Sequence, residues 1–239
     1  MQALDRTIAP RILLAGAILA AFPALAAPPS FECAKAASRV ERTICASPSL
    51  ARADAALSAA YQEARRTLAP EAAALLLVDE KRFLAARERV FSTGDKDPAA
   101  LLLGEIEDRI AFLRNLRVPP PGRLAGTWSN LFGTATVTPG PGGEFAVKVD
   151  ANEPITARWT CGAQGKGKGK GTATATGALL TVSLGEDGSA LTLARDGETL
   201  KLGSVPGKGE AEGTADYCGL NGSVDGTYFF VEPAAAPAR

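Results

Sequence analysis

The chain has 239 residues, with 26 basic and 26 acidic side chains, and it contains no histidine. This charge balance gives no support for binding to nucleic acid or to an anionic membrane surface. The lack of histidine excludes Ser-His and Cys-His catalysis and every zinc site that uses histidine.

The first 26 residues have the pattern of a secretory signal peptide. Arg6 and Arg11 precede an apolar run over residues 12–25, which ends in Ala-Leu-Ala at positions 24–26. We therefore predict a signal peptide over residues 1–26 and a periplasmic or secreted mature protein. The apolar run is too short for a stop-transfer helix, so we expect no stable membrane anchor after the signal is removed. A retained anchor is the alternative.

The four cysteines all follow the predicted signal peptide, two in each half of the chain: Cys33, Cys45, Cys161 and Cys218. An even number in an oxidising compartment indicates disulfides rather than thiol chemistry. Three pairings are open, and the change of composition near the middle of the chain favours Cys33 with Cys45 and Cys161 with Cys218.

Residues 31–117 form a predicted helical domain that is rich in Ala, Leu, Arg and Glu. The capping box Ser38-x-x-Glu41 predicts a short helix over residues 39–45. Apolar residues at helical spacing predict three longer helices, over about residues 48–68, 70–93 and 98–116. Short connections between them indicate an antiparallel helical bundle.

Residues 118–122 are a predicted proline linker, beyond which Gly and Thr dominate and apolar residues recur at every second position. Eight or so short strands, separated by Gly-rich turns, predict an antiparallel β-barrel or sandwich over residues 123–232. One of these alternating runs is Ile155, Ala157, Trp159 and Cys161. The tail over residues 233–239 is Ala and Pro, and we expect it to be disordered.

The predicted fold class is therefore α+β in two domains, with an N-terminal antiparallel helical bundle and a C-terminal antiparallel β-barrel or sandwich. The Gly-Thr-Trp opening of the second domain, which ends at Trp128, is similar to small barrels that begin with a Trp-bearing strand. This likeness concerns the fold alone.

The sequence offers little catalytic chemistry. Residues 165–171, Gly-Lys-Gly-Lys-Gly-Lys-Gly, lack the Gly-Lys-Ser/Thr ending and the following helix of a phosphate-binding loop. We interpret them as a flexible strand connection with solvated lysines, Lys166, Lys168 and Lys170; a basic prong for an acidic partner is the alternative.

Carboxylates cluster at Asp79-Glu80 and at Glu105, Glu107 and Asp108, next to Arg and Lys on predicted helices. We interpret both groups as solvated, ion-paired helix faces, because a catalytic carboxylate pair needs a partly dry, concave setting. No nucleophile, base and oxyanion grouping can be assembled. The sequence therefore predicts a protein that is not an enzyme and has no cofactor and no metal site.

A set of spaced residues resembles the N-terminal domain of the LprI-type lysozyme inhibitor family over about residues 31–116. The set is Phe31, Cys33, Lys35, Val40, Glu41, Ile44, Cys45, Pro48, Leu50, Asp54, Leu57, Ala60, Tyr61, Arg82, Phe83, Leu84, Arg87, Ile110 and Leu113. The family usually has a second cysteine pair, and here Val90 and residues 101–103 stand where that pair would be. We expect the loop over residues 92–98 to be looser for this reason.

The resemblance implies an exported protein-binding module that acts on a lysozyme-like glycosidase. Alternatives are a non-catalytic cell-envelope scaffold, a ligand-binding protein without lysozyme inhibition and, third, a hydrolase. A glycosidase cleft carries acidic residues, so an inhibitor needs Arg or Lys on a protruding segment. The candidate partner contacts are Arg39, Arg42, Lys166, Lys168 and Lys170.

Overall fold

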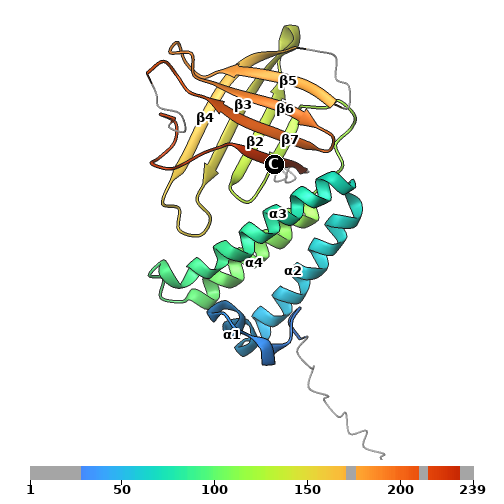
Figure 1. Ribbon diagram of the computed structural model, residues 1–239, viewed down its shortest axis with the longest axis vertical. Coiled ribbons are helices and arrows are strands. Elements are labelled where there is room, and N and C mark those ends of the chain that lie inside the picture. Colours follow the sequence, from blue (N-terminus) through green and yellow to red (C-terminus); the bar gives the residue numbers. More distant parts are fainter. Residues whose placement is uncertain (1–27, 171–175, 210–214, 232–239) are drawn as a thin grey trace, which may run out of the picture.

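A computed structural model describes residues 28–170, 176–209 and 215–231, with helices in the N-terminal part and strands in the C-terminal part (Figure 1). The predicted signal peptide and the predicted disordered tail lie outside the described residues. The helical elements are η1 Cys33–Lys35, α1 Arg39–Ala46, α2 Pro48–Thr67, α3 Pro70–Ala86, η2 Arg87–Ser92, α4 Pro98–Asn115 and η3 Pro141–Gly143. The strands are β1 Gly126–Ser129, β2 Gly133–Pro139, β3 Glu144–Asn152, β4 Thr160–Lys170, β5 Thr176–Ser183, β6 Ala190–Asp196, β7 Thr199–Val205 and β8 Gly226–Val231.

Each long helix begins where a cap or a proline permits it. Helix α1 has the predicted capping box: the hydroxyl of Ser38 accepts from the amide of Glu41, and the carboxylate of Glu41 accepts from the amide of Ser38 over 2.9 Å. Helices α2, α3 and α4 begin at Pro48, Pro70 and Pro98, where a missing amide hydrogen costs nothing.

The third predicted helix is shorter than expected. Its α-helical part ends at Ala86, and the chain then tightens into the 3₁₀ turn η2 before Gly94. This turn positions Arg89, which donates to Glu153 in the site described below, and Arg87, which pairs with Asp54 in the helical core.

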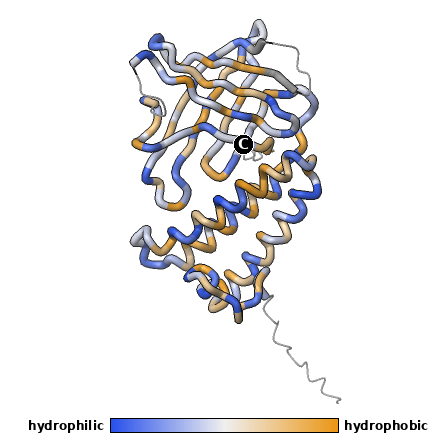
Figure 2. Tube along the Cα trace, in the orientation of Figure 1, coloured by the Kyte–Doolittle hydropathy of each residue, from blue (hydrophilic) through white to orange (hydrophobic). Residues whose placement is uncertain are grey.

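The strands form a closed antiparallel barrel, in which each strand pairs with the next and β8 closes on β1. The sequence left a barrel and a sandwich open, and the structure selects the barrel. Hydrophobic and hydrophilic residues alternate along the strands (Figure 2). The apolar ones fill the interior together with the buried Arg195, whose guanidinium lies 4.9 Å from the ring centre of Trp128. Trp128 of β1 is fully buried there and donates from Nε1 to the carbonyl oxygen of Leu124 over 2.8 Å.

Residues 165–170 of the glycine-lysine run are part of strand β4, so the expected flexible connection is wrong there. Lys166 pairs with Ala146 of β3 and Lys168 with Glu144. The glycines between them allow β5 to approach closely: a Cβ on Gly167 would lie 1.9 Å from the carbonyl oxygen of Thr181. These glycines therefore meet a packing demand rather than a need for flexibility.

The predicted strand through Ile155 and Ala157 is also wrong. Both residues lie in the loop between β3 and β4, with positive φ values of 74° and 45°. The amide of Ala157 donates to the carbonyl oxygen of Glu153 over 3.1 Å, which closes a turn. Strand pairing resumes only at Thr160.

Helices α3 and α4 lie beneath one end of the barrel, and α1 lies farthest from it (Figure 1). Phe229 and Val231 of β8 belong to the same buried cluster as the helical core. The backbone of Leu116 pairs with Val231, and the amide of Ala69 donates to the carboxylate of Glu198 over 2.7 Å. The helices and the barrel are thus joined by apolar packing and by hydrogen bonds.

Candidate functional site

The basic residues that the sequence singled out lie in two separate places. Arg39 and Arg42 are exposed on α1; the guanidinium of Arg39 lies 4.0 Å from the ring centre of Phe91, and Arg42 donates to the carbonyl oxygen of Ala37 over 2.6 Å. Lys166 and Lys168 are exposed on the outer face of the barrel.

Strand β4 extends away from its first residue, Thr160, and Lys166 is six positions along it. At about 3.3 Å per residue this separation is about 20 Å. The side chain of Lys170 lies outside the described residues. The structure does not bring the lysines together with the arginines of α1.

A buried carboxylate organises a different basic group. Glu153, at the start of the β3–β4 loop, accepts from Arg158 through Nε at 2.9 Å, Nη2 at 2.8 Å and the backbone amide at 3.2 Å. The hydroxyl of Thr156 also donates to it. Arg89 of η2 donates from Nη1 over 2.9 Å.

These donors favour the ionised form of Glu153. The hydrogen bonds from Arg158, followed by that from Thr156, lower its pKa to about 2. The carboxylate therefore stays charged at neutral pH and holds the loop against η2.

The β3–β4 loop is strained. Ile155, Ala157 and Asn221 are the non-glycine residues with positive φ in the described chain, and Ile155 is β-branched, for which this conformation is unfavourable. At Ile155 and Ala157 this conformation costs on the order of 1–3 kcal/mol per residue and persists only where the surroundings enforce it, whereas asparagine adopts it readily. Strain of this kind gathers at functional sites.

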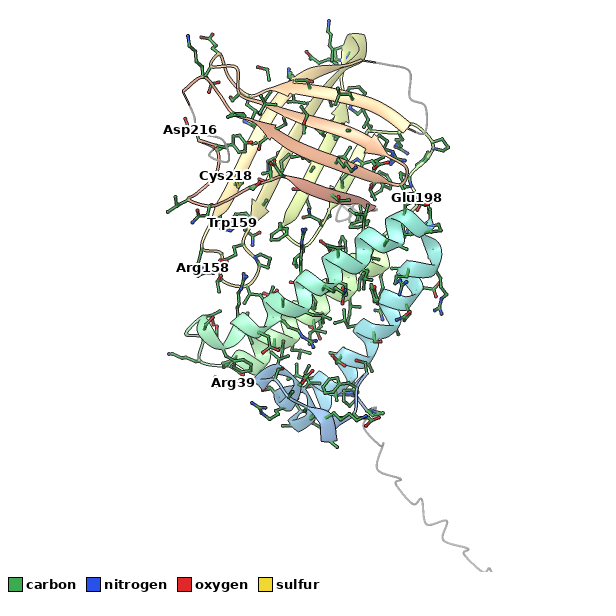
Figure 3. The ribbon with its side chains drawn as sticks, viewed as in Figure 1. Arg39, Arg158, Trp159, Glu198, Asp216 and Cys218 are labelled. Carbon is green, nitrogen blue, oxygen red and sulfur yellow. A yellow bond between two sulfur atoms is a disulfide. The ribbon has the colours of Figure 1, made fainter. Side chains whose placement is uncertain are left out.

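Asn221 lies in a turn that is tied to the same loop. The disulfide Cys161–Cys218 joins the two segments, and the amide of Gly219 donates to the carbonyl oxygen of Thr160 over 2.8 Å. The residues with positive φ therefore occupy two neighbouring loops at one edge of the barrel, where Figure 3 places Trp159 and Cys218.

The exposed side chains of this region form what we call the arginine edge, defined as Arg39, Arg89, Arg158, Trp159 and Leu220. The side chains of Arg158 and Arg89 are 71% and 43% exposed, and Leu220 is 85% exposed. Trp159 is half-buried. Figure 3 shows Arg158 directed toward the helical part and Arg39 farther along the same side.

Two sets of contacts hold the arginine edge in place: contacts of its arginines with η2, and the packing of Trp159 on Phe132. Arg39 packs on Phe91 of η2, and Arg89 of η2 binds Glu153 beside Arg158. The ring of Trp159 stacks on that of Phe132, with ring centres 6.1 Å apart. A surface hollow of about 420 Å³ lies between η2 and the loop; it is lined by Arg89, Ser92, Thr93, Ile155, Thr156 and Arg158.

Asp79 and Glu80 are buried, so the expectation of a solvated face is wrong for them. Arg109 of α4 donates to Asp79 over 2.8 Å and to Glu80 over 2.9 Å. The amide of Leu131 also donates to Asp79, so the cluster links helices to barrel. Burial raises the pKa of Glu80 although Arg109 lowers it.

Glu107 and Asp108 are exposed, as expected, whereas Glu105 is half-buried. Burial, followed by the charge of Asp108, raises the pKa of Glu105. Glu105 and Asp108 line a hollow of about 310 Å³ between α4 and the barrel.

Two residues quoted for the family resemblance meet in the helical core. Asp54 of α2 accepts from Nη1 of Arg87 over 3.3 Å, and both side chains are buried. Ser30 donates to the same carboxylate from its amide and its hydroxyl, over 2.9 and 2.6 Å. The disulfide Cys33–Cys45 closes the adjacent segment, and both observed disulfides have the favoured pairing.

Arg89 and Arg158 were missed from the sequence. Their local sequence is that of ordinary surface arginines, and only the fold brings both to Glu153. The one available signal was Pro154, which argued against a continuous strand there.

The described residues contain no group of three or more histidine, cysteine or carboxylate side chains placed to hold a metal ion. Within the same part of the chain, no helix has both the length and the apolar character to cross a membrane.

Comparison with curated proteins and with solved structures finds no match. The comparison with family models bears on the helical part alone. Residues 33–113, the N-terminal part of the chain that holds the Cys33–Cys45 disulfide and the Asp54–Arg87 ion pair, match the model of the family described as Lysozyme inhibitor LprI.

Proposed function

We propose that the mature chain is an exported, non-catalytic protein that binds a lysozyme-like glycosidase and blocks its substrate cleft. The observation that carries this proposal is the family match over residues 33–113. Two disulfides and the signal-like first 26 residues support export, because disulfides persist in oxidising compartments.

The chemistry of the target explains what such a protein must present. A glycosidase cleft holds a pair of carboxyl groups on either side of the scissile bond. A protein that blocks this cleft gains specificity from cations placed opposite those groups. Arginine suits the task because its planar guanidinium can donate two parallel hydrogen bonds to one carboxylate.

The barrel interior supports a protein partner over a ligand held inside the barrel. Trp128, Leu193 and Tyr228 are among the fully buried side chains that fill it. A barrel of eight strands is about wide enough either for its own side chains or for one small ligand, and here these side chains occupy the space. The loops and the outer surface are therefore where a partner would bind.

A lysis assay tests the proposal. The mature chain, beginning after residue 26, is mixed with lysozymes of several structural types, and the clearing of a bacterial cell-wall suspension is followed. We expect slower clearing with at least one lysozyme at near-stoichiometric amounts, and no effect from an equal amount of an unrelated neutral protein. Unchanged clearing with every lysozyme at a large molar excess would refute inhibition and leave the envelope scaffold as the better account.

A further inference from the structure

We infer that the arginine edge is the surface that enters the partner's cleft, with Arg158 facing the cleft carboxylates and Arg89, Trp159 and Leu220 flanking it. This inference rests on the proposed function and assigns it to particular residues. It shifts the contact from the lysines of β4 to the loops at the helix-facing edge of the barrel.

The arginine edge is held in shape before any partner binds. Glu153 fixes Arg158 through three hydrogen bonds and Arg89 through one. The Cys161–Cys218 disulfide anchors the loop to the neighbouring turn. A loop that is already held in shape loses little conformational entropy when it binds, and this raises affinity.

The arginine edge also has the sign of charge that an acidic cleft attracts. Two arginines share one carboxylate, so the group formed by Arg89, Glu153 and Arg158 keeps one positive charge. Arg158 binds Glu153 through Nε and Nη2, which leaves Nη1 for an acceptor on the partner. The hollow between Arg89 and Arg158 can receive a carboxylate side chain from the cleft wall.

The side chains of the arginine edge are of the kinds that protein interfaces favour. Tryptophan and arginine are the residues that most often dominate the binding energy of protein interfaces. Here Trp159 is held against Phe132 beside the exposed arginine, and Leu220 is 85% exposed in the adjacent turn. An apolar residue so exposed at the tip of a braced turn is suited to a contact that excludes water around Arg158.

The lysines of β4 do not offer the same fit. Lys166 and Lys168 project from the paired strands of the barrel wall, so they form part of a broad face rather than a protrusion. A broad face cannot reach the floor of a cleft. The pair therefore serves as a matched control for positive charge elsewhere on the same barrel.

The test measures the dissociation constant of the full mature chain with the lysozyme that it inhibits most strongly. We expect Arg158→Ala to weaken binding by about 30-fold or more, the loss typical of a central interface arginine. Arg158→Lys should recover only part of this loss, because lysine cannot reproduce the paired Nε and Nη2 hydrogen bonds that fix Arg158 on Glu153. The double variant Lys166→Ala/Lys168→Ala should change the constant by less than about 2-fold, as expected for exposed charges outside an interface.

Leu220→Asp separates binding from folding, because Leu220 lies outside the Glu153 hydrogen bonds. It should weaken binding by at least about 10-fold, since it places a carboxylate opposite the cleft carboxylates. Its melting temperature should match that of the wild type.

The outcomes separate the two proposals. If wild type binds lysozyme and both Arg158→Ala and Leu220→Asp bind equally well, the arginine edge is wrong while inhibition stands. If wild type binds no lysozyme, the proposed function fails and this inference fails with it. A third outcome is that the wild type binds dextran sulfate but no lysozyme, and that Arg158→Ala abolishes this binding. The partner of the arginine edge would then be an anionic polymer and not a glycosidase.

Discussion

Arg89 of η2 and Arg158 of the β3–β4 loop donate to the same oxygen, Oε1 of Glu153, over 2.9 and 2.8 Å. One arginine comes from the helical part and the other from the barrel. The shared carboxylate therefore fastens the loop to the helices and keeps two cations close together at the surface.

The pH dependence of stability tests this arrangement. The pKa of Glu153 falls from the ordinary 4.5 to about 2 in the folded protein. A lowered carboxyl pKa stabilises the fold fully above about pH 4.5, and the contribution is lost as the pH falls toward 2. We expect Glu153→Gln to melt at a lower temperature than wild type at pH 7, and the two melting temperatures to converge near pH 2.

Circular dichroism melts at pH 7, 4 and 2.5 provide the measurement. Other carboxylates titrate over the same range, so the difference between the two proteins is the informative quantity. A difference that stays constant across these pH values would contradict the assigned pKa.

The buried pair of Asp54 and Arg87 gives a second prediction. Their side chains are only 4% and 10% exposed. Arg87→Met would leave the Asp54 charge buried without its partner, so we expect a loss of about 3–5 kcal/mol in the free energy of unfolding, measured with urea. Arg66→Met, which removes an exposed ion pair with Glu63, should cost less than about 1 kcal/mol. Similar losses in the two variants would be inconsistent with the burial described.

Two glycines of β4 give a matched comparison. A Cβ at Gly167 would overlap the carbonyl oxygen of Thr181, whereas a Cβ at Gly162 would meet nothing within 4 Å. We expect Gly167→Ala to destabilise the protein by about 1–3 kcal/mol through overpacking, and Gly162→Ala to leave the melting temperature nearly unchanged. Equal melting temperatures for the two variants would show that β4 and β5 are not packed this closely.

The Cys33–Cys45 disulfide closes a segment with a sequence separation of 12. Its loss in Cys33→Ser/Cys45→Ser should cost about 3 kcal/mol by the chain-entropy estimate. Far-UV circular dichroism, which reports on the helices, should show a lower melting temperature for this variant than for wild type. A melting temperature equal to that of wild type under oxidising conditions would show that the disulfide does not stabilise the fold.

Features that depend on local chemistry could be predicted from the sequence. The capping box at Ser38 and Glu41, the prolines that open helices and the period-two alternation of the strands each act over a few residues. Cysteine pairing also followed, because the change of composition separated the two pairs. These rules predict which elements form but not every contact between them.

Features that depend on distant partners could not be predicted. Asp79 and Glu80 resembled a solvated helix face, but Arg109 lies 29 positions beyond Glu80 in the sequence and covers both. Ile155 and Ala157 have the spacing of a strand, yet the hydrogen bonds of Glu153 turn the chain there. The glycines of β4 resembled a flexible segment because the close approach of β5 is not visible in the local sequence.

Hydrogen–deuterium exchange of the chain that begins after residue 26, with and without the lysozyme that the lysis assay identifies, locates the surface that the partner covers. We predict that bound lysozyme slows exchange in three segments, residues 87–92, 153–160 and 218–222, and leaves residues 164–168 of β4 unaffected. Protection confined to other surfaces, or no protection at saturating lysozyme, would contradict the assignment of the arginine edge as the inhibitory surface.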